Sequence, residues 1–285
     1  MTHDTHLKSL VLWTTLWVGI SLIAFWPTLV WMAERFDAHD SFYSHGWLIP
    51  VATGWLIWRN RIRLAAVPRA SSWWGLPLLA SSLAIHVFAT RLHLGFASGF
   101  ALLGVVTGIL WTCWGGAMVR ALRVPILFLL FMIPLPGVLL IATSFRMKLL
   151  AASMATGVMK LFGMPAVQAG STIHVPGISV VVDDTCSGLR SLISLIALST
   201  LWVVLLPSST KRSHRWMLVA ASIPIALVAN MVRIIVLVLL SAIYGPQIAE
   251  SFIHYGSGMV VFAVALAVLA WMSRRLTNWP TPAHS

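Results

Sequence analysis

The sequence predicts an all-α protein, a polytopic membrane bundle of about eight transmembrane helices. Hydrophobic residues make up 59% of the 285 residues and charged residues only 9%, which is more apolar side chain than a soluble domain of this length can bury. The apolar residues form long runs instead of alternating segments of about ten residues, which excludes an outer-membrane barrel. Basic residues come in short clusters between these runs, so a membrane explains the net charge of +12 better than a nucleic acid does.

The apolar runs, taken in order, give the expected spans. They lie at approximately 9–33, 44–58, 75–90, 95–117, 124–143, 188–206, 216–243 and 251–273. The fourth contains Gly104 and Gly108, small residues that allow close helix packing. Pro134 and Pro136 are expected to break or kink the fifth.

Two segments between the fifth and sixth spans differ from the rest. Residues 144–164 form an Ala/Met/Leu-rich segment interrupted by Arg146, Lys148 and Lys160, which predicts an amphipathic helix in the outer interface. Residues 166–184 are rich in Val, Ile and Thr and predict a short extracytoplasmic loop or hairpin. We expect residues 1–285 to form one membrane-embedded domain.

The distribution of charge predicts the orientation. The basic clusters at 59–63 and 211–215 indicate cytoplasmic loops, whereas the acidic segment 34–40 indicates the opposite side. Eight spans then leave both termini in the cytoplasm.

The most informative stretch is residues 180–194, where a β-branched run ends in two acids, a lone thiol and a small-residue turn. Cys186 stands where this loop becomes an apolar helix. Unpaired N–H groups at a helix N-terminus favour a thiolate. Arg190 follows one turn later and is placed to pair with Asp183 or Asp184. The second cysteine, Cys113, lies in a Trp-flanked apolar run and is expected only to pack.

Two further polar residues fall at the same depth as Cys186. Arg233 comes 18 residues after Arg215, roughly 27 Å along a helix at about 1.5 Å per residue, and therefore close to the outer face. His254 opens the last span on that same side. A thiolate can attack a carbonyl, an imidazole can carry protons, and a guanidinium can stabilise an oxyanion or the thiolate. The set predicts acyl transfer at a membrane surface.

Five stretches of the sequence resemble the exosortase/archaeosortase family of membrane-embedded cysteine transpeptidases. In family order they are Tyr43-Ser44-His45-Gly46-Trp47-Leu48-Ile49-Pro50, Met132-Ile133-Pro134-Leu135-Pro136, Asp184-Thr185-Cys186-Ser187-Gly188-Leu189-Arg190-Ser191, Ala229-Asn230-Met231-Val232-Arg233-Ile234 and Phe252-Ile253-His254-Tyr255-Gly256. With histidine at position 254, the sequence resembles the bacterial branch of the family more than the archaeal branch. Asp184, where the family often has Glu, and Trp47, where Phe is common, are small departures.

The resemblance implies specific roles. Cys186 is the expected nucleophile, Arg233 the expected oxyanion or thiolate stabiliser and His254 the expected general acid and base. The supporting residues are Arg190, Asn230, Asp184 and His45.

The resemblance also implies a reaction and its partners. Substrates would be exported proteins with a C-terminal signal made of a Pro-Glu-Pro-like motif, a transmembrane helix and a basic cluster. The acyl group would pass from the cysteine to an acceptor, in a reaction linked to exopolysaccharide and biofilm. The expected location is the bacterial inner membrane, with the active site facing the periplasm. Membrane lipids and exopolysaccharide assembly proteins are the other expected partners, and no nucleic acid, cofactor or metal is expected.

Two other readings remain open at the level of the sequence. A transporter or lipid-linked flippase could use Arg233 as an anion site, although no pair of broken helices repeats in the two halves. A zinc site could be built from Cys186, His254 and His174, although close ligand spacing is missing.

Overall fold

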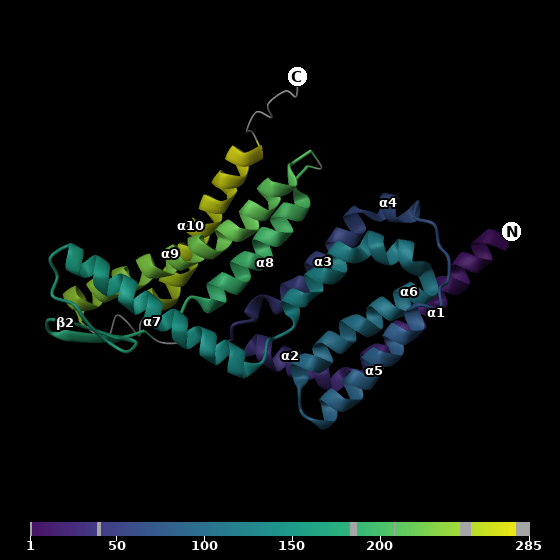
Figure 1. Cartoon of the computed structure of the whole chain (residues 1–285), viewed down its shortest axis with the longest axis horizontal. Helices are drawn as coiled ribbons and strands as arrows, with labels where there is room; N and C mark the ends of the chain where they lie inside the picture. Colours follow the sequence, from purple (N-terminus) through teal and green to yellow (C-terminus); the bar gives the residue numbers. More distant parts are fainter. Residues whose placement is uncertain (1, 39–40, 183–186, 208, 246–251, 278–285) are drawn as a thin grey trace, which may run out of the picture. The chain divides into compact units, whose positions relative to one another are not determined.

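The computed structural model describes residues 2–38, 41–182, 187–207, 209–245 and 252–277 (Figure 1). The chain forms two compact units, Met1–Pro136 and Gly137–Ser285, each of which is described by itself. The structure is all-α apart from one small sheet in the second unit.

Within its described residues, the first unit has helices as its only regular secondary structure. Its elements are α1 (Thr2–Ala24), α2 (Trp26–Asp37), η1 (Ser44–Trp47), α3 (Leu48–Arg59), α4 (Arg61–Ala65), α5 (Gly75–Arg91), α6 (Gly95–Phe128) and η2 (Leu129–Met132). The expected first span is bent, because α1 and α2 meet at an angle of 67° next to the fully buried Phe25. The small residues of α6 allow the close packing that was predicted. A Cβ atom on Gly108 would lie 3.0 Å from Leu79 Cβ of α5.

Helix α6 contains a break at Gly115, where φ is 84° and ψ is 169°. Only glycine adopts this conformation without strain, and a Cβ there would collide with the carbonyl oxygen of Ala70. The chain changes direction at this point (Figure 1). The break therefore falls two residues before the end of the expected fourth span, 95–117. The expected fifth span, 124–143, is not one helix, because the chain leaves η2 through Pro134 and Pro136 and starts a new helix at Gly137.

The contacts of the first unit join loops that were expected on the same side of the membrane. The Arg69 guanidinium lies 5.2 Å from the centre of the Trp114 ring, which joins two segments expected near the cytoplasm. Trp47 Nε1 donates a 2.9 Å hydrogen bond to Asp37, which joins two segments expected outside.

The second unit contains α7 (Gly137–Leu161), β1 (Val167–Ala169), β2 (Thr172–Val175), β3 (Ile178–Val181), α8 (Leu189–Leu205), α9 (Arg212–Tyr244) and α10 (Phe252–Thr277). The strands form an antiparallel sheet in the order β1-β2-β3. The segment expected to be a hairpin or loop is thus a three-stranded meander. It packs on α7 and α9, since Ile173 and Val175 are buried in one cluster with Ala155 and Val238.

The segment expected to form an interfacial helix, 144–164, falls largely within α7, a single helix from 137 to 161. No residue of this segment interrupts backbone hydrogen bonding, so the helix continues through Arg146 and Lys148. Helix α7 meets the length and hydropathy requirements of a membrane span.

By length and composition, four helices of the described chain can cross a membrane, or five if the bent α1–α2 pair is one span. The four segments are Gly95–Met132, Gly137–Leu161, Arg212–Ser241 and Gly256–Leu276. The eight expected spans are thus not all present as helices of spanning length. Helix α3 has 12 residues, and α5 and α8 have 17 each, which is short of the about 20 residues that cross a bilayer.

Candidate active site

Helix α9 carries two buried polar residues on one face. Asn230 and Arg233 lie three residues apart, a spacing that puts them on the same side of a helix. Asn230 is 4% exposed and Arg233 is 8% exposed, although both belong to the long apolar span Arg212–Ser241. A buried arginine in such a helix is costly, and such residues are found where they have a function or a partner.

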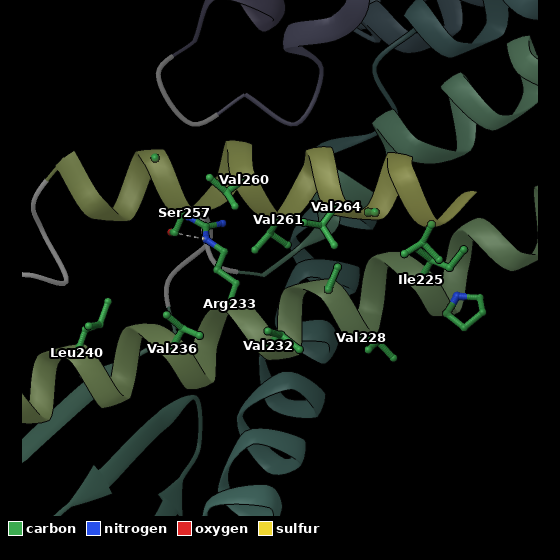
Figure 2. Close-up of a pocket in the computed structure, with 15 residues that line it drawn as sticks. Ile225, Val228, Val232, Arg233, Val236, Leu240, Ser257, Val260, Val261 and Val264 are labelled. Atoms are coloured by element: carbon green, nitrogen blue, oxygen red, sulfur yellow. Dashed lines mark hydrogen bonds between the residues drawn. The ribbon is translucent and has the colours of Figure 1, made fainter. Parts of the chain in front are cut away.

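Arg233 reaches across to the neighbouring helix α10. Its Nε donates a 3.3 Å hydrogen bond to Ser257 Oγ (Figure 2). Its Cζ lies against Gly258, where an added Cβ atom would be only 3.4 Å away. The guanidinium is therefore held against the α10 backbone, which fixes the direction of its planar fork of donors.

Asn230 is packed against the start of α8. Gly188 is the N-cap residue of α8 and has φ of 76°, in the left-handed region that favours glycine. A Cβ atom on Gly188 would lie 2.6 Å from Asn230 Cγ, so the absence of a side chain brings the two elements together. The preceding residue, Ser187, is fully buried, and its Oγ accepts a 3.3 Å hydrogen bond from the Leu189 N–H.

Three helices meet at this point. Ser191 of α8 and the Asn230–Arg233 pair of α9 line one small cavity, which α10 closes with Gly258. Arg190 is half-buried in the first turn of α8. The site therefore combines the N-terminus of a helix, an amide and a guanidinium at one end of the C-terminal bundle, which are groups that stabilise negative charge.

The structure describes the other predicted residues of the site only in part. Cys186 and Asp184 lie outside the described residues. His254 belongs to α10, three residues before Ser257, and its side chain also lies outside the described part. The structure does bring together the residues next to them in sequence: Gly188, two positions after the cysteine, touches Asn230.

His45 lies in η1 of the first unit, whereas Arg233 lies in the second unit. The His45 ring stacks on Tyr43, with 5.8 Å between the ring centres. Tyr43 is 4% exposed and accepts a 3.2 Å hydrogen bond from the Leu135 N–H. Burial raises the pKa of Tyr43, and this outweighs the opposite effect of that hydrogen bond, so the phenol stays neutral.

Within the described ranges, no group of three or more His, Cys, Asp and Glu side chains could hold a metal ion. His174, the described residue of the zinc reading, lies in β2, where its Nδ1 is 2.7 Å from Ser179 Oγ.

Sequence reasoning missed two contributors to this site. It did not single out Ser257, although this residue follows His254 by one helical turn and so shares its face. It also treated Gly188 only as part of a motif, whereas the structure requires glycine there for both its backbone conformation and its contact with Asn230.

The fold and this site define a multi-pass helical membrane protein with a buried polar cluster at one end of its C-terminal bundle. The family model Transmembrane exosortase (Exosortase_EpsH) matches residues 31–271, and the chain belongs to this family. Searches of the curated proteins and of the solved structures found no match.

Proposed function

We propose that this exosortase is a cysteine transpeptidase that cleaves C-terminal sorting signals of exported proteins and passes the acyl group to an acceptor. The observation that carries the proposal is the junction of α8, α9 and α10. There Gly188 of the Cys-Ser-Gly-x-Arg stretch contacts Asn230, and Arg233, one turn further along α9, is bound to Ser257. Two of the five family stretches thus meet in a single buried cluster, together with Ser257, the residue that directly follows a third stretch.

The chemistry follows from the residue types. The Cys186 thiolate attacks the carbonyl carbon of the scissile peptide, and the Arg233 guanidinium stabilises the resulting oxyanion. When the C–N bond breaks, His254 gives its proton to the leaving amine, and a thioester remains on the cysteine. The acceptor loses a proton to His254 as it attacks the thioester, which returns the enzyme to its starting state. Arg190 and Asp184 hold the start of α8, while Asn230 and His45 are positioning residues.

We further propose that the chain crosses the inner membrane eight times, that the fifth crossing ends at the Pro134–Pro136 break and that α7 lies in the outer interface, with both termini in the cytoplasm and the site facing the periplasm. Residues Gly95–Met132 number 38, about 57 Å of helix at about 1.5 Å per residue, nearly twice the roughly 30 Å hydrocarbon core. With the break at Gly115, this segment is long enough for two crossings. Arg120 and Arg123 then lie just after the turn, where the positive-inside rule places basic residues.

The contacts at the opposite end of the second unit agree with this orientation. Arg215 Nη2 donates a 2.8 Å hydrogen bond to the carbonyl of Pro207, and Trp202 Nε1 donates a 3.0 Å hydrogen bond to Ser273 Oγ. These residues belong to the ends of α8, α9 and α10 that are expected in the cytoplasm. The polar cluster around Arg233 lies near the other ends of α8 and α10, and 11 residues before the end of α9 at Tyr244.

The proposal is tested with the purified protein in proteoliposomes and a tagged single-span substrate that ends in a Pro-Glu-Pro motif, an apolar helix and a basic cluster. We expect a shorter tagged product that a thiol-alkylating reagent suppresses and a metal chelator leaves unchanged. Suppression by the chelator would support the zinc reading. No product from folded, correctly inserted protein would contradict the proposal and leave the transporter hypothesis.

A further inference from the structure

Helices α9 and α10 enclose a long groove of about 860 Å³ (Figure 2). This volume lies within the roughly 300–1,000 Å³ that is usual for ligand sites. On α9 the lining runs from Pro224 to Leu240, 17 residues whose ends are about 24 Å apart at about 1.5 Å per residue. The groove is therefore long enough to extend through most of the roughly 30 Å thickness of the hydrocarbon core.

The lining is aliphatic apart from Arg233 and Ser257, and it repeats every three or four residues along both helices. Val228 and Val232 stand on the α9 wall, and Val260 and Val264 stand on the α10 wall (Figure 2). These four side chains are 46–63% exposed, so the groove opens sideways toward the surroundings of the bundle.

The composition of the walls favours a rigid occupant over fluid lipid tails. Valine in a helix has one strongly preferred χ1 rotamer, so these walls have their shape before anything binds and lose little side-chain entropy when something does. Ala229, Gly256 and Ala265 add small residues to the walls. In a membrane, where apolar burial drives nothing, such surfaces bind another helix by close packing.

The polar contact lies near one end of the α10 wall, whereas the α9 wall continues past Arg233 through Val236 to Leu240 (Figure 2). Arg233 and Ser257 form this contact, and on α10 the aliphatic lining continues from it to Val268. A matching occupant has a polar, electron-rich segment at the arginine and an apolar rod beyond it. An extended peptide that enters a transmembrane helix has this form, since its carbonyl groups can accept from a guanidinium.

We infer that this groove holds the transmembrane helix of the substrate, with the peptide just before that helix presented to Arg233. The inference rests on the proposed function, to which it adds the place where the substrate is held. It also gives a reason for cleavage close to the start of the helix: the packed helix fixes how far the preceding peptide reaches past the arginine.

The test uses full-length protein with a photo-crosslinking amino acid at one position at a time, together with the tagged single-span substrate. Val264 lines the groove, whereas Met259 lies on the same helix outside the lining and is 71% exposed. We expect crosslinks to the substrate helix from position 264 to exceed those from position 259 at least tenfold. Equal crosslinking from both positions, or crosslinks from position 264 to lipid alone, would overturn the inference.

A second measurement separates this inference from the proposed function. Val264→Trp fills the groove, and Met259→Trp adds the same bulk outside it; neither position is buried, so both variants are expected to fold. We expect Val264→Trp to lower the processing rate at least tenfold at limiting substrate, with a smaller loss at saturation, and Met259→Trp to process normally. Equal rates in both variants would refute the groove while processing itself still stands. Failure of the unaltered protein to process the substrate would refute both.

Discussion

Gly188 and Asn230 are in contact because residue 188 has no side chain: a Cβ atom there would lie 2.6 Å from Asn230 Cγ. The contact joins the N-terminus of α8 to the face of α9 that carries Arg233. It is therefore the contact on which the geometry of the proposed active site depends most directly.

Gly188→Ala is expected to reduce processing at least tenfold. The alanine must adopt a φ of 76°, which costs about 1–2 kcal/mol, and its Cβ must also displace Asn230. Gly177→Ala is the matched control, since Gly177 has φ of 81° but nothing within 4 Å of the added Cβ. If both variants lose rate equally at matched membrane abundance, backbone strain alone explains the effect and the contact with Asn230 is unimportant.

Arg233→Lys is expected to slow processing by ~10²-fold or more, as when an oxyanion donor is removed. Lysine keeps the charge but offers a point charge on a flexible stem in place of a planar fork held by Ser257. Arg190→Lys should lose less rate and act mainly on protein yield. The measurement is the initial rate at matched abundance. A near-normal rate for Arg233→Lys would mean that Arg233 acts only as a diffuse counter-charge and not as a directional donor.

Tyr43→Phe is expected to destabilise the first unit by about 0.5–1.5 kcal/mol, since it removes the acceptor of the part-buried hydrogen bond from the Leu135 N–H. The loss would appear as a lower Tm of the purified protein in detergent. Tyr244→Phe is the control, because Tyr244 is 70% exposed. Equal Tm values for the Tyr43 variant and the unaltered protein would show that the hydrogen bond does not support the loop after η2.

The orientation can be tested with single cysteines in a background that lacks Cys113 and Cys186. A cysteine at Ser171, in the turn between β1 and β2, should react with an impermeant thiol reagent in cells with a permeabilised outer membrane. Cysteines at Ser71 and Ser213, both in segments expected in the cytoplasm, should react only after the inner membrane is opened. The reverse pattern would place the active site in the cytoplasm.

Much of this arrangement could be predicted from the sequence. The depth of Arg233 follows from its distance from Arg215 and the rise of a helix, and the structure buries this residue on α9, where α8 and α10 meet it. The break at Pro134 and Pro136 also follows from local chemistry, since proline cannot continue a helix.

The rest depends on contacts between distant segments. The turn of α6 at Gly115 is set by the approach of Ala70, 45 positions away in sequence, and nothing in the local pattern distinguishes Gly115 from Gly116. Ser257 is an ordinary helix residue until Arg233 reaches it from α9.

The central claim is that the thiol of Cys186 forms the acyl intermediate, and a pair of single-cysteine variants tests it most directly. Cys186→Ala and Cys113→Ala are expressed to equal membrane abundance with the tagged substrate, and processing is followed by gel mobility. Cys186→Ala is expected to give no product, while Cys113→Ala keeps most of the activity because Cys113 packs against the α6 core cluster. Normal processing by Cys186→Ala would contradict the account.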